Sequence, residues 1–233
     1  MIVLSQLPWE TQEAVETTRQ RVARLHAQLP RWELVVWTAG NVSERVPGAD
    51  LFVIKPSGVS YDELSPHNMV VCTLDGEKIN DGTSPRLTPS SDTAAHAYVY
   101  RHMPEVGGVV HTHSTYATAF AARMEEIPCV LTMMADEFGG PIPIGPVAVI
   151  GDDSIGRGIV ETLRGQRSPA VLMGHHGPFT IGKDGQAAVK AAVLCEEVAR
   201  TIHVAQQKGP VESLPQDLID ALHDRYQNVY GQR

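Results

Sequence analysis

The chain has 233 residues, with 19 Lys and Arg against 27 Asp and Glu and a formal net charge of −8 at pH 7. An acidic balance without a basic stripe excludes nucleic acid and an anionic membrane surface as partners. The length allows a substantial core. Because no linker, repeat or run of like charge marks a boundary, we expect one domain over residues 1–233.

The chain ends and the cysteines bear on the cellular compartment. The N-terminus lacks a basic stretch followed by an apolar segment of signal length, and no segment is long and apolar enough to span a bilayer. Cys72, Cys129 and Cys195 are far apart in mainly apolar contexts, which favours reduced core thiols over disulfides or a zinc ribbon. We therefore expect a soluble, cytoplasmic protein with no membrane partner.

The first half of the chain opens on a helix and continues with short apolar strands. Apolar residues at helical spacing predict a helix over 10–29 that ends at Pro30. Residues 34–45 predict a strand, a glycine-containing turn and a second strand. Residues 50–64 similarly predict an apolar strand and a Pro-Ser-Gly turn, followed by a new segment. The Asp-Gly pair within 69–79 predicts a hairpin.

The second half alternates helices with strands. In order, we expect a helix over 88–103, a strand over 106–113, a helix over 114–123, a strand over 170–182, a helix over 184–208 and a short C-terminal helix before a polar end. This order predicts an α/β fold in which helices cover a mixed sheet.

Two histidines stand one residue apart at the end of an apolar run. Residues 106–110 are typical of a buried strand, in which positions two apart share a face, so His111 and His113 point the same way. Imidazole is the commonest protein ligand for zinc and similar ions. The alternative is a pair of polar residues where a strand leaves the core.

A second histidine pair supplies a candidate third ligand. His176 adjoins the Gly177-Pro178 turn, where the backbone can aim its side chain off the strand, while His175 faces the opposite way. On its own, a pair of adjacent histidines is more often exposed to solvent, or buried with its hydrogen bonds satisfied, than bound to a metal. Together with His-x-His on another strand end it favours a metal site, and three neutral imidazoles leave a divalent cation with open positions for catalysis.

Hydroxyl residues gather where a helix is expected to begin. Ser90, Ser91 and the free N–H groups of the first turn form a candidate anion site, because the helix dipole favours negative charge there; simple N-capping is the alternative. Asp92 is either a first-turn acid or a neighbour of the metal.

A second candidate anion site lies earlier in the chain. Lys55, Ser57 and Gly58 combine a cation with a glycine turn, the composition of a phosphate cradle, although an isolated Pro-Ser-Gly predicts only a turn. Asn41 has two alternative roles, either to form a turn or to contact the substrate.

Seven motifs occur in order along residues 38–232, namely TAGNVSER, FVIKPSGV, TPSSDTAAH, GGVVHTHS, MMADEFGG, HHGPF and VYGQ. Together they resemble the class II aldolase/adducin-head superfamily and, within it, the L-ribulose-5-phosphate 4-epimerases. The resemblance implies a three-layer α/β/α fold with a central mixed β-sheet flanked by helices. It also implies a homotetramer with active sites at subunit interfaces, and a divalent metal, Zn²⁺ first with Mn²⁺ or Co²⁺ as alternatives.

The resemblance also implies roles for particular residues. The metal ligands that it implies are Asp92, His111, His113 and His176. The residues that it places around the substrate phosphate are Gly40, Asn41, Lys55, Ser57, Gly58, Ser90 and Ser91. The catalytic residues that it implies are Asp92 with an acid/base pair lent by a neighbouring subunit, Asp136 and Tyr230.

The implied reaction is the interconversion of L-ribulose 5-phosphate and D-xylulose 5-phosphate by breaking and re-forming C3–C4, an isomerase step of arabinose catabolism. Related aldolases deprotonate a carbon and carry glutamate where this chain has Asp92, so the shorter acid favours the epimerase. A sugar-phosphate aldolase or a dehydratase of the same superfamily is the alternative. A non-enzymatic module like the adducin head is the third.

Overall fold

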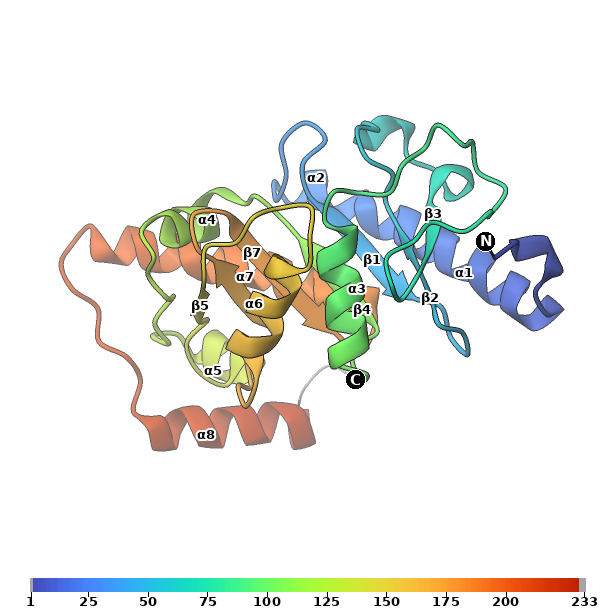
Figure 1. Cartoon of the computed structure of the whole chain (residues 1–233). Helices are drawn as coiled ribbons and strands as arrows, with labels where there is room; N and C mark the ends of the chain where they lie inside the picture. Colours follow the sequence, from blue (N-terminus) through green and yellow to red (C-terminus); the bar gives the residue numbers. More distant parts are fainter. Residues whose placement is uncertain (1, 231–233) are drawn as a thin grey trace.

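The computed structural model describes the backbone of residues 2–230 and the side chains of residues 2–229 (Figure 1). Its strands form one seven-stranded sheet in the order β3-β2-β1-β4-β7-β6-β5. All neighbouring pairs are antiparallel except β5 and β6, so the sheet is mixed. The strands are β1 (Asn41–Arg45), β2 (Leu51–Ile54), β3 (Val70–Thr73), β4 (Gly108–His111), β5 (Ile144–Gly145), β6 (Ala170–Met173) and β7 (Gly177–Gly182).

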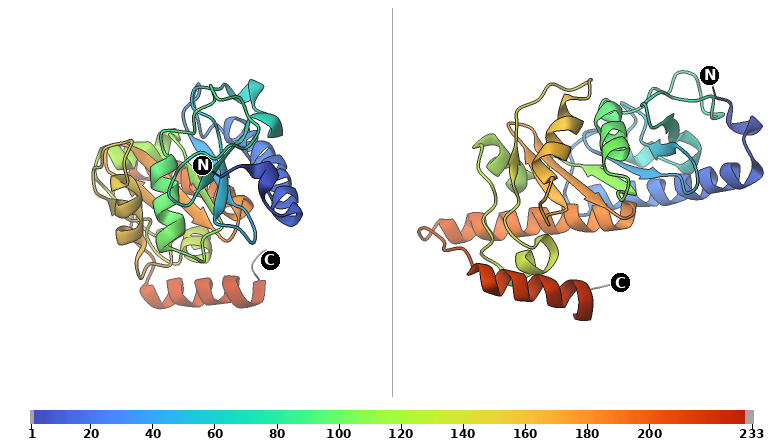
Figure 2. Two further views of the ribbon diagram at one scale, coloured as in Figure 1. Left: turned by 45° about the vertical axis from the view of Figure 1, so that its right-hand side comes forward. Right: turned by 60° about the horizontal axis from the view of Figure 1, so that its bottom comes forward.

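Helices cover both faces of this sheet (Figure 2). On one face α1 and α7 lie along the strands and α4 packs on β6 and β7, while α3 and α6 pack together on the other face. This arrangement confirms the predicted three-layer α/β/α fold. That residues 1–233 form one domain stays a prediction. The α-helices are α1 (Trp9–His26), α2 (Gln28–Arg31), α3 (Thr93–His102), α4 (Thr115–Ala122), α5 (Thr132–Phe138), α6 (Ser154–Leu163), α7 (Gly185–Gln206) and α8 (Gln216–Arg225).

Short helical turns complete the chain. They are η1 (Leu4–Gln6), η2 (Tyr61–Glu63), η3 (Pro66–Asn68) and the π-helical turn η4 (Tyr226–Tyr230). No helix among the residues that the structure describes is long and apolar enough to cross a membrane.

The longest helix illustrates how the sequence pattern sets the layers. Asp184 caps α7 by accepting a hydrogen bond from the Ala187 N–H at 2.8 Å, which satisfies one free donor of the first turn. Small and apolar residues then recur at helical spacing and are buried against the sheet. They are Ala188, Val189, Ala191, Ala192, Cys195, Val198, Ala199 and Ile202.

Two strand predictions are wrong in detail. Residues 34–37 do not form a strand: Glu33 and Trp37 have positive φ angles of 57° and 59°, and the Trp37 side chain is 88% exposed. Residues 170–182 form two strands, because Gly174, His175 and His176 make the turn between β6 and β7. Gly177 and Pro178 therefore begin a strand.

The strand register brings chemically important positions together at one end of the sheet. Asn41, the first residue of β1, pairs with His111, the last residue of β4. His111 also pairs with Phe179 on β7. The three central strands thus place one end of β1, the end of β4 and the start of β7 around the histidine motif.

Candidate metal centre and substrate pocket

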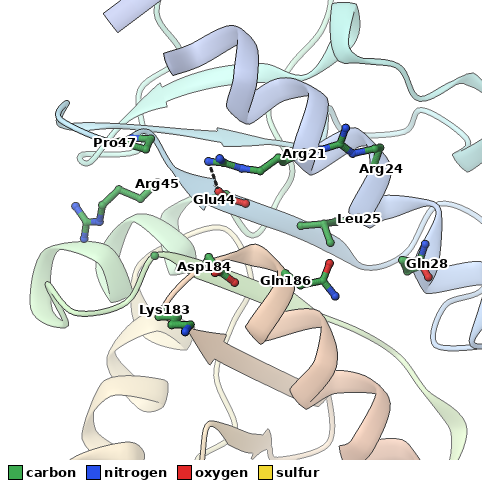
Figure 3. A pocket seen from close by; sticks show the side chains of 11 residues that line it. Arg21, Arg24, Leu25, Gln28, Glu44, Arg45, Pro47, Lys183, Asp184 and Gln186 are labelled. Carbon is green, nitrogen blue, oxygen red and sulfur yellow. Dashed lines mark ion pairs between the residues drawn. The ribbon is translucent and has the colours of Figure 1, made fainter. Parts of the chain in front are cut away.

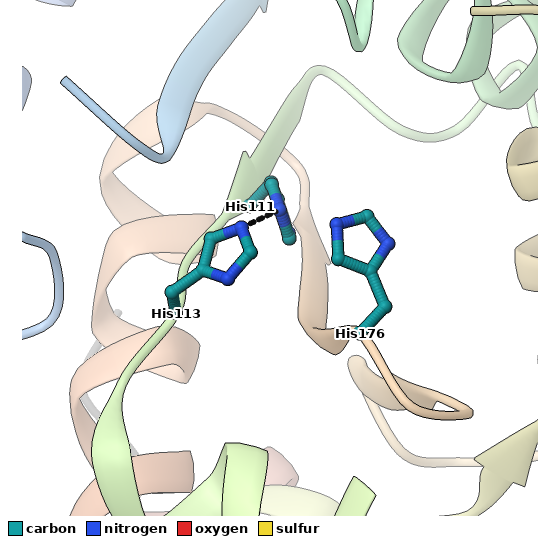
Figure 4. A group of neighbouring side chains, drawn as sticks. All are labelled: His111, His113 and His176. Carbon is teal, nitrogen blue, oxygen red and sulfur yellow. Dashed lines mark hydrogen bonds between the residues drawn. The ribbon is translucent and has the colours of Figure 1, made fainter. Parts of the chain in front are cut away.

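Three histidines converge where β4 ends and the β6–β7 turn passes (Figure 4). One ring nitrogen from each of His111, His113 and His176 lies within 4.8 Å of the others. The Nε2 atoms of His111 and His113 are 2.9 Å apart. His175 has a φ of 54° and is exposed, so this left-handed residue turns the chain and leaves His176 facing the other two rings.

Hydrogen bonding sets the tautomer of His111. Its Nδ1 donates to the carbonyl oxygen of Pro178 at 3.1 Å, which leaves the lone pair of a neutral ring on Nε2, facing the cluster. Burial lowers the pKa of His111 well below its usual value and also lowers the pKa of His113 and His176. All three rings are therefore neutral near pH 7, the state in which imidazole binds a metal.

Asp92 lies beside this cluster and is buried. It occupies the N-cap position of α3, but its side chain makes no capping bond. Instead Oδ2 accepts a hydrogen bond from Asn41 Nδ2 at 2.7 Å, while Oδ1 is buried and has no partner among the residues that the structure describes. The charge of Asp92 raises the pKa of His113 and His176 against the larger effect of burial, which shows that the carboxylate acts on the cluster. Asp92 is thus a candidate fourth ligand.

Gly40 allows the chain just before β1 to pass close to the backbone of His111. Its φ is 78°, and a Cβ there would lie 2.5 Å from a Val35 methyl and 2.9 Å from the His111 carbonyl oxygen. Both the conformation and the space require glycine. Asn41 Nδ2 also donates to Ser90 Oγ at 3.0 Å, so this amide links Ser90 to Asp92.

Lys55 is a buried cation next to these residues. Its Nζ donates to the carbonyl oxygens of Thr38 at 3.1 Å and Pro56 at 3.4 Å, and lies 5.5 Å from the centre of the Tyr61 ring. No ion pair among the described side chains involves Lys55. Burial lowers its pKa. A buried ammonium paired only with carbonyl oxygens fits an anionic ligand.

The two serine motifs run side by side. The Ser90 N–H donates to the Lys55 carbonyl at 3.0 Å, and the Ser57 N–H donates to the Thr88 carbonyl at 2.8 Å. Ser57, Gly58 and Ser91 are exposed, and Gly58 has a φ of 69°. The structure therefore joins the two predicted anion sites into one rim beside Asp92.

Asp136 lies elsewhere in the same chain. It belongs to α5, which packs on α8, and the His223 Nδ1 donates to its carbonyl at 3.1 Å. Partial burial raises the pKa of Asp136 although Arg225 and His223 oppose this shift. Asp136 lines a cavity of about 330 Å³ with Met133, Glu137, Lys190, Leu194 and Tyr226. The side chain of Tyr230 lies outside the described residues.

A larger cavity lies at the other end of β1 and contains none of the predicted site residues (Figure 3). It measures about 550 Å³. Both acidic residues in its lining already have a partner: Glu44 forms an ion pair with Arg21 at 2.5 Å, and Asp184 caps α7. Its lining residues are Arg21, Arg24, Leu25, Gln28, Glu44, Arg45, Pro47, Gly107, Lys183, Asp184 and Gln186.

Sequence reasoning missed two side chains of the site. The Tyr61 hydroxyl donates to the carbonyls of Ala39 at 2.8 Å and Gly40 at 3.1 Å, and so holds the glycine turn. His96 is fully buried in α3, one turn after Asp92. The i, i+4 spacing of Asp92 and His96 is a signal that could have drawn attention to the second residue.

The chain belongs to a known family of proteins. The class II aldolase and adducin N-terminal domain matches residues 20–203, which is most of the chain. The L-ribulose-5-phosphate 4-epimerase UlaF of Salmonella paratyphi B is 42% identical over 205 residues, covering 84% of this chain and 88% of that protein. The probable L-ribulose-5-phosphate 4-epimerase UlaF of Mycoplasma pneumoniae is 38% identical over 213 residues, covering 85% and 86%.

Solved structures share the fold. An L-fuculose 1-phosphate aldolase superposes with a TM-score of 0.83 at 23% identity, covering 91% of this chain and 96% of that one. YgbL of Klebsiella pneumoniae superposes with a TM-score of 0.77 at 27% identity, covering 90% and 99%. The family match over residues 20–203 and the relatives at 42% and 38% identity confirm the predicted superfamily.

Proposed function

We propose that the protein is a divalent-metal-dependent enzyme that interconverts L-ribulose 5-phosphate and D-xylulose 5-phosphate. The observation that carries this proposal is a cluster of three neutral histidines together with the buried Asp92. Asn41 links Asp92 to Ser90, and Ser90 hydrogen-bonds the backbone of the buried Lys55. Such a site joins a metal centre to an anion subsite, as a phosphorylated ketose requires. The relatives named as L-ribulose-5-phosphate 4-epimerases, which match over most of the chain, support the same substrate.

The donor set fits a divalent cation. The three ring nitrogens lie close enough to share one ion. Asp92 is outside this group of mutually close ligand atoms, but its buried Oδ1 has no hydrogen-bond partner among the described residues and is a further oxygen donor. We therefore assign His111, His113, His176 and Asp92 as the residues that hold the metal, Zn²⁺ first and Mn²⁺ or Co²⁺ as alternatives. When bound, the cation supplies a Lewis acid that stabilises the negative charge developing on the substrate oxygens.

The phosphate subsite fixes one end of the substrate. Lys55 supplies the positive charge. Hydroxyl, amide and backbone donors come from the other residues that we assign to this subsite, which are Gly40, Asn41, Ser57, Gly58, Ser90 and Ser91. Binding of the phosphate is needed because the C4–C5 fragment must stay in the site after the C3–C4 bond breaks. A fragment held only by its phosphate can turn and present the other face of its aldehyde carbon.

The acid/base groups move the proton of the C4 hydroxyl. One group takes this proton while the C3–C4 electron pair passes toward the C2 carbonyl oxygen, and glycolaldehyde phosphate forms within the site. The other group returns a proton to the C4 oxygen after the bond re-forms on the opposite face. We assign these roles to Asp136 and Tyr230.

Asp136 is not among the groups around the histidines of its own chain, since its neighbours are on α5, α7 and α8. We therefore propose that a neighbouring subunit lends Asp136 and Tyr230 to each site, in a homotetramer with active sites at subunit interfaces. The free thiols of Cys72, Cys129 and Cys195 fit a reducing compartment, and we propose the cytoplasm.

The proposal is tested with zinc-loaded and metal-free protein incubated with L-ribulose 5-phosphate, following D-xylulose 5-phosphate and glycolaldehyde phosphate together. The epimerase forms the first without releasing the second, and only when metal is present. Accumulating glycolaldehyde phosphate would instead identify an aldolase of the same family. No turnover with metal-loaded protein would contradict both activities.

A further inference from the structure

Two side chains that follow β2 hold three consecutive carbonyl groups just before β1. The Lys55 Nζ donates to the Thr38 carbonyl at 3.1 Å. The Tyr61 hydroxyl lies 2.8 Å from the Ala39 carbonyl oxygen and 3.1 Å from that of Gly40, so its single proton is shared between two acceptors. The chain that leads into β1 is therefore held from one side by Lys55 and Tyr61.

The turn at Gly40 needs such an external contact. Its φ of 78° is accessible to glycine, but glycine populates negative φ values as readily, so the residues of the turn do not fix its conformation by themselves. In a trans peptide the carbonyl and the N–H point in opposite directions. Tyr61 binds the carbonyls of both peptide groups that flank Gly40, and so directs the N–H groups of Gly40 and Asn41 away from its own hydroxyl.

Asn41 depends directly on this turn. It follows Gly40, and its Nδ2 donates to Ser90 Oγ at 3.0 Å and to Asp92 Oδ2 at 2.7 Å. A rotation of the peptide between Gly40 and Asn41 would move this amide away from both acceptors. The Tyr61 hydroxyl therefore acts on Ser90 and Asp92 through Asn41.

The Tyr61 ring makes a second contact, with Lys55. The Lys55 Nζ lies 5.5 Å from the centre of the ring, within the range of a cation–π interaction. Lys55 is buried and Tyr61 is half-buried. Burial raises the pKa of the Tyr61 hydroxyl, so this group remains a proton donor at neutral pH. One side chain thus contacts both the cation and the glycine turn of the proposed phosphate subsite.

We propose that Tyr61 is a positioning residue of this phosphate subsite. Its hydroxyl fixes the two peptide groups around Gly40, and its ring holds the Lys55 ammonium beside them. Tyr61 acts through Lys55 and Asn41, which it keeps in the arrangement that binds an anion. The role rests on the phosphate subsite of the proposed function.

The start of β1 has a separate anchor, so the strand should survive the loss of the Tyr61 hydroxyl. Burial lowers the pKa of His26 to about 3, and the neutral ring accepts the Val42 N–H at Nε2 at 3.0 Å. Its Nδ1 donates to the Val22 carbonyl of α1 at 2.7 Å. Removing the Tyr61 hydroxyl should therefore alter the glycine turn while β1 stays in place against α1.

Two substitutions separate the hydroxyl from the ring. Tyr61→Phe removes the hydroxyl and keeps the ring, and Tyr61→Leu removes both. We measure the Kd of inorganic phosphate for the full-length holoenzymes by titration calorimetry at constant ionic strength. Losing a hydrogen bond of ordinary strength should weaken phosphate binding about three- to tenfold in Tyr61→Phe. Losing the cation–π contact as well should weaken it about a further two- to fivefold in Tyr61→Leu.

Turnover supplies a second readout that a purely structural role would not move. The KM for L-ribulose 5-phosphate should rise by the same factors as the phosphate Kd. The kcat and the bound zinc of Tyr61→Phe should stay within about twofold of the unaltered protein, because the hydroxyl positions the groups that bind the phosphate.

Tyr100→Phe is the matched control. Tyr100 is also buried, and its hydroxyl lies 2.8 Å from Ser43 Oγ, so its removal costs a comparable hydrogen bond outside the phosphate subsite. A merely structural Tyr61 would lower the thermal stability as Tyr100→Phe does, without changing phosphate affinity. A phosphate Kd for Tyr61→Phe within twofold of the unaltered protein, or an equal loss of affinity in Tyr100→Phe, would overturn the proposal.

The outcomes distinguish the role of Tyr61 from the proposed function. A protein that binds phosphate in a Tyr61-dependent way but does not convert L-ribulose 5-phosphate contradicts the proposed activity and supports the positioning role. Normal conversion with unchanged phosphate Kd and KM in both Tyr61 variants contradicts the positioning role alone. An unaltered protein that neither binds phosphate nor converts the sugar phosphate overturns both.

Discussion

Replacing Lys55 with Met separates substrate binding from folding. Lys55 is 2% exposed, and among the described residues its Nζ donates to two backbone carbonyls and lies over the Tyr61 ring. Methionine has a similar length without the charge, so Lys55→Met keeps most of the packing and removes the desolvated cation. The free energy of unfolding should therefore change by less than about 2 kcal/mol, because losing two weak carbonyl contacts offsets the relief of a buried charge.

The effect on substrate is larger. A hydrogen bond to a charged group contributes about 1.5–3 kcal/mol, which corresponds to a KM for L-ribulose 5-phosphate raised about 10- to 150-fold. Because burial lowers the pKa of Lys55, the unaltered enzyme should also lose affinity at alkaline pH below the ordinary lysine value of 10.5. Lys55→Met should show no such alkaline loss.

The assay is steady-state kinetics with a urea unfolding curve for each variant. Lys78→Met is the matched control: its Nζ donates to the carbonyls of Ser84 at 3.1 Å and Leu87 at 2.7 Å, but it lies outside the proposed site. We expect an unchanged KM for the control. A KM for Lys55→Met within twofold of the unaltered enzyme would refute the assignment of Lys55 to the phosphate.

Three further predictions concern the role of Asp136, the sharing of active sites between subunits and the buried His26. Asp136→Asn should lower kcat at least about tenfold with zinc content intact, and a near-normal kcat contradicts its role. Asp153→Asn is the control and should not lower kcat, because Asp153 is a half-buried acid at the N-cap of α6. Mixed tetramers of Asp136→Asn and His113→Ala should regain activity, because some sites then receive an intact half from each chain, and no regain contradicts shared sites. Burial lowers the pKa of His26 from 6.5 to about 3, so the unfolded state gains a proton first and stability falls as pH drops below 6.5. For His26 alone the loss in unfolding free energy at pH 5 is about 2 kcal/mol in metal-free protein, and a flat urea profile from pH 7 to 5 contradicts this.

Local patterns could predict much of the histidine cluster. Alternation along a strand placed His111 and His113 on one side, even though β4 itself ends at His111. The position of His176 next to a turn separated it from His175, although the turn is formed by residues 174–176 and not, as predicted, by Gly177 and Pro178. These arguments succeeded because each depends on only a few consecutive residues.

Other features depended on tertiary contacts that a sequence does not display. The β-branched residues after Pro30 favour a strand. In the structure, however, Leu34 is the only buried residue of 34–37. Its N–H donates to the Leu29 carbonyl at 2.9 Å and so closes a turn. Helix α6 was not predicted because Gly156 and Gly158 lower helix propensity. Gly156 is needed for packing, since a Cβ there would lie 2.7 Å from the Ala95 carbonyl oxygen of α3.

The contacts between separate motifs were also beyond local patterns. The sequence could not show that Ser90 hydrogen-bonds the Lys55 carbonyl, or that Asn41 bridges Ser90 and Asp92. Each motif alone favoured a turn or a helix cap. Only the contacts that join these motifs to Asp92 favour a substrate-binding site.

The fate of the hydrogen on C4 tests the central claim most directly. L-ribulose 5-phosphate deuterated at C4 is converted in ordinary water, and the D-xylulose 5-phosphate formed is analysed by mass spectrometry. Cleavage and re-formation of C3–C4 never break the C4–H bond, so the account predicts a product that keeps all of its deuterium. Loss of deuterium to solvent would show that C4 is inverted by removing its hydrogen, and would contradict the mechanism proposed for this site.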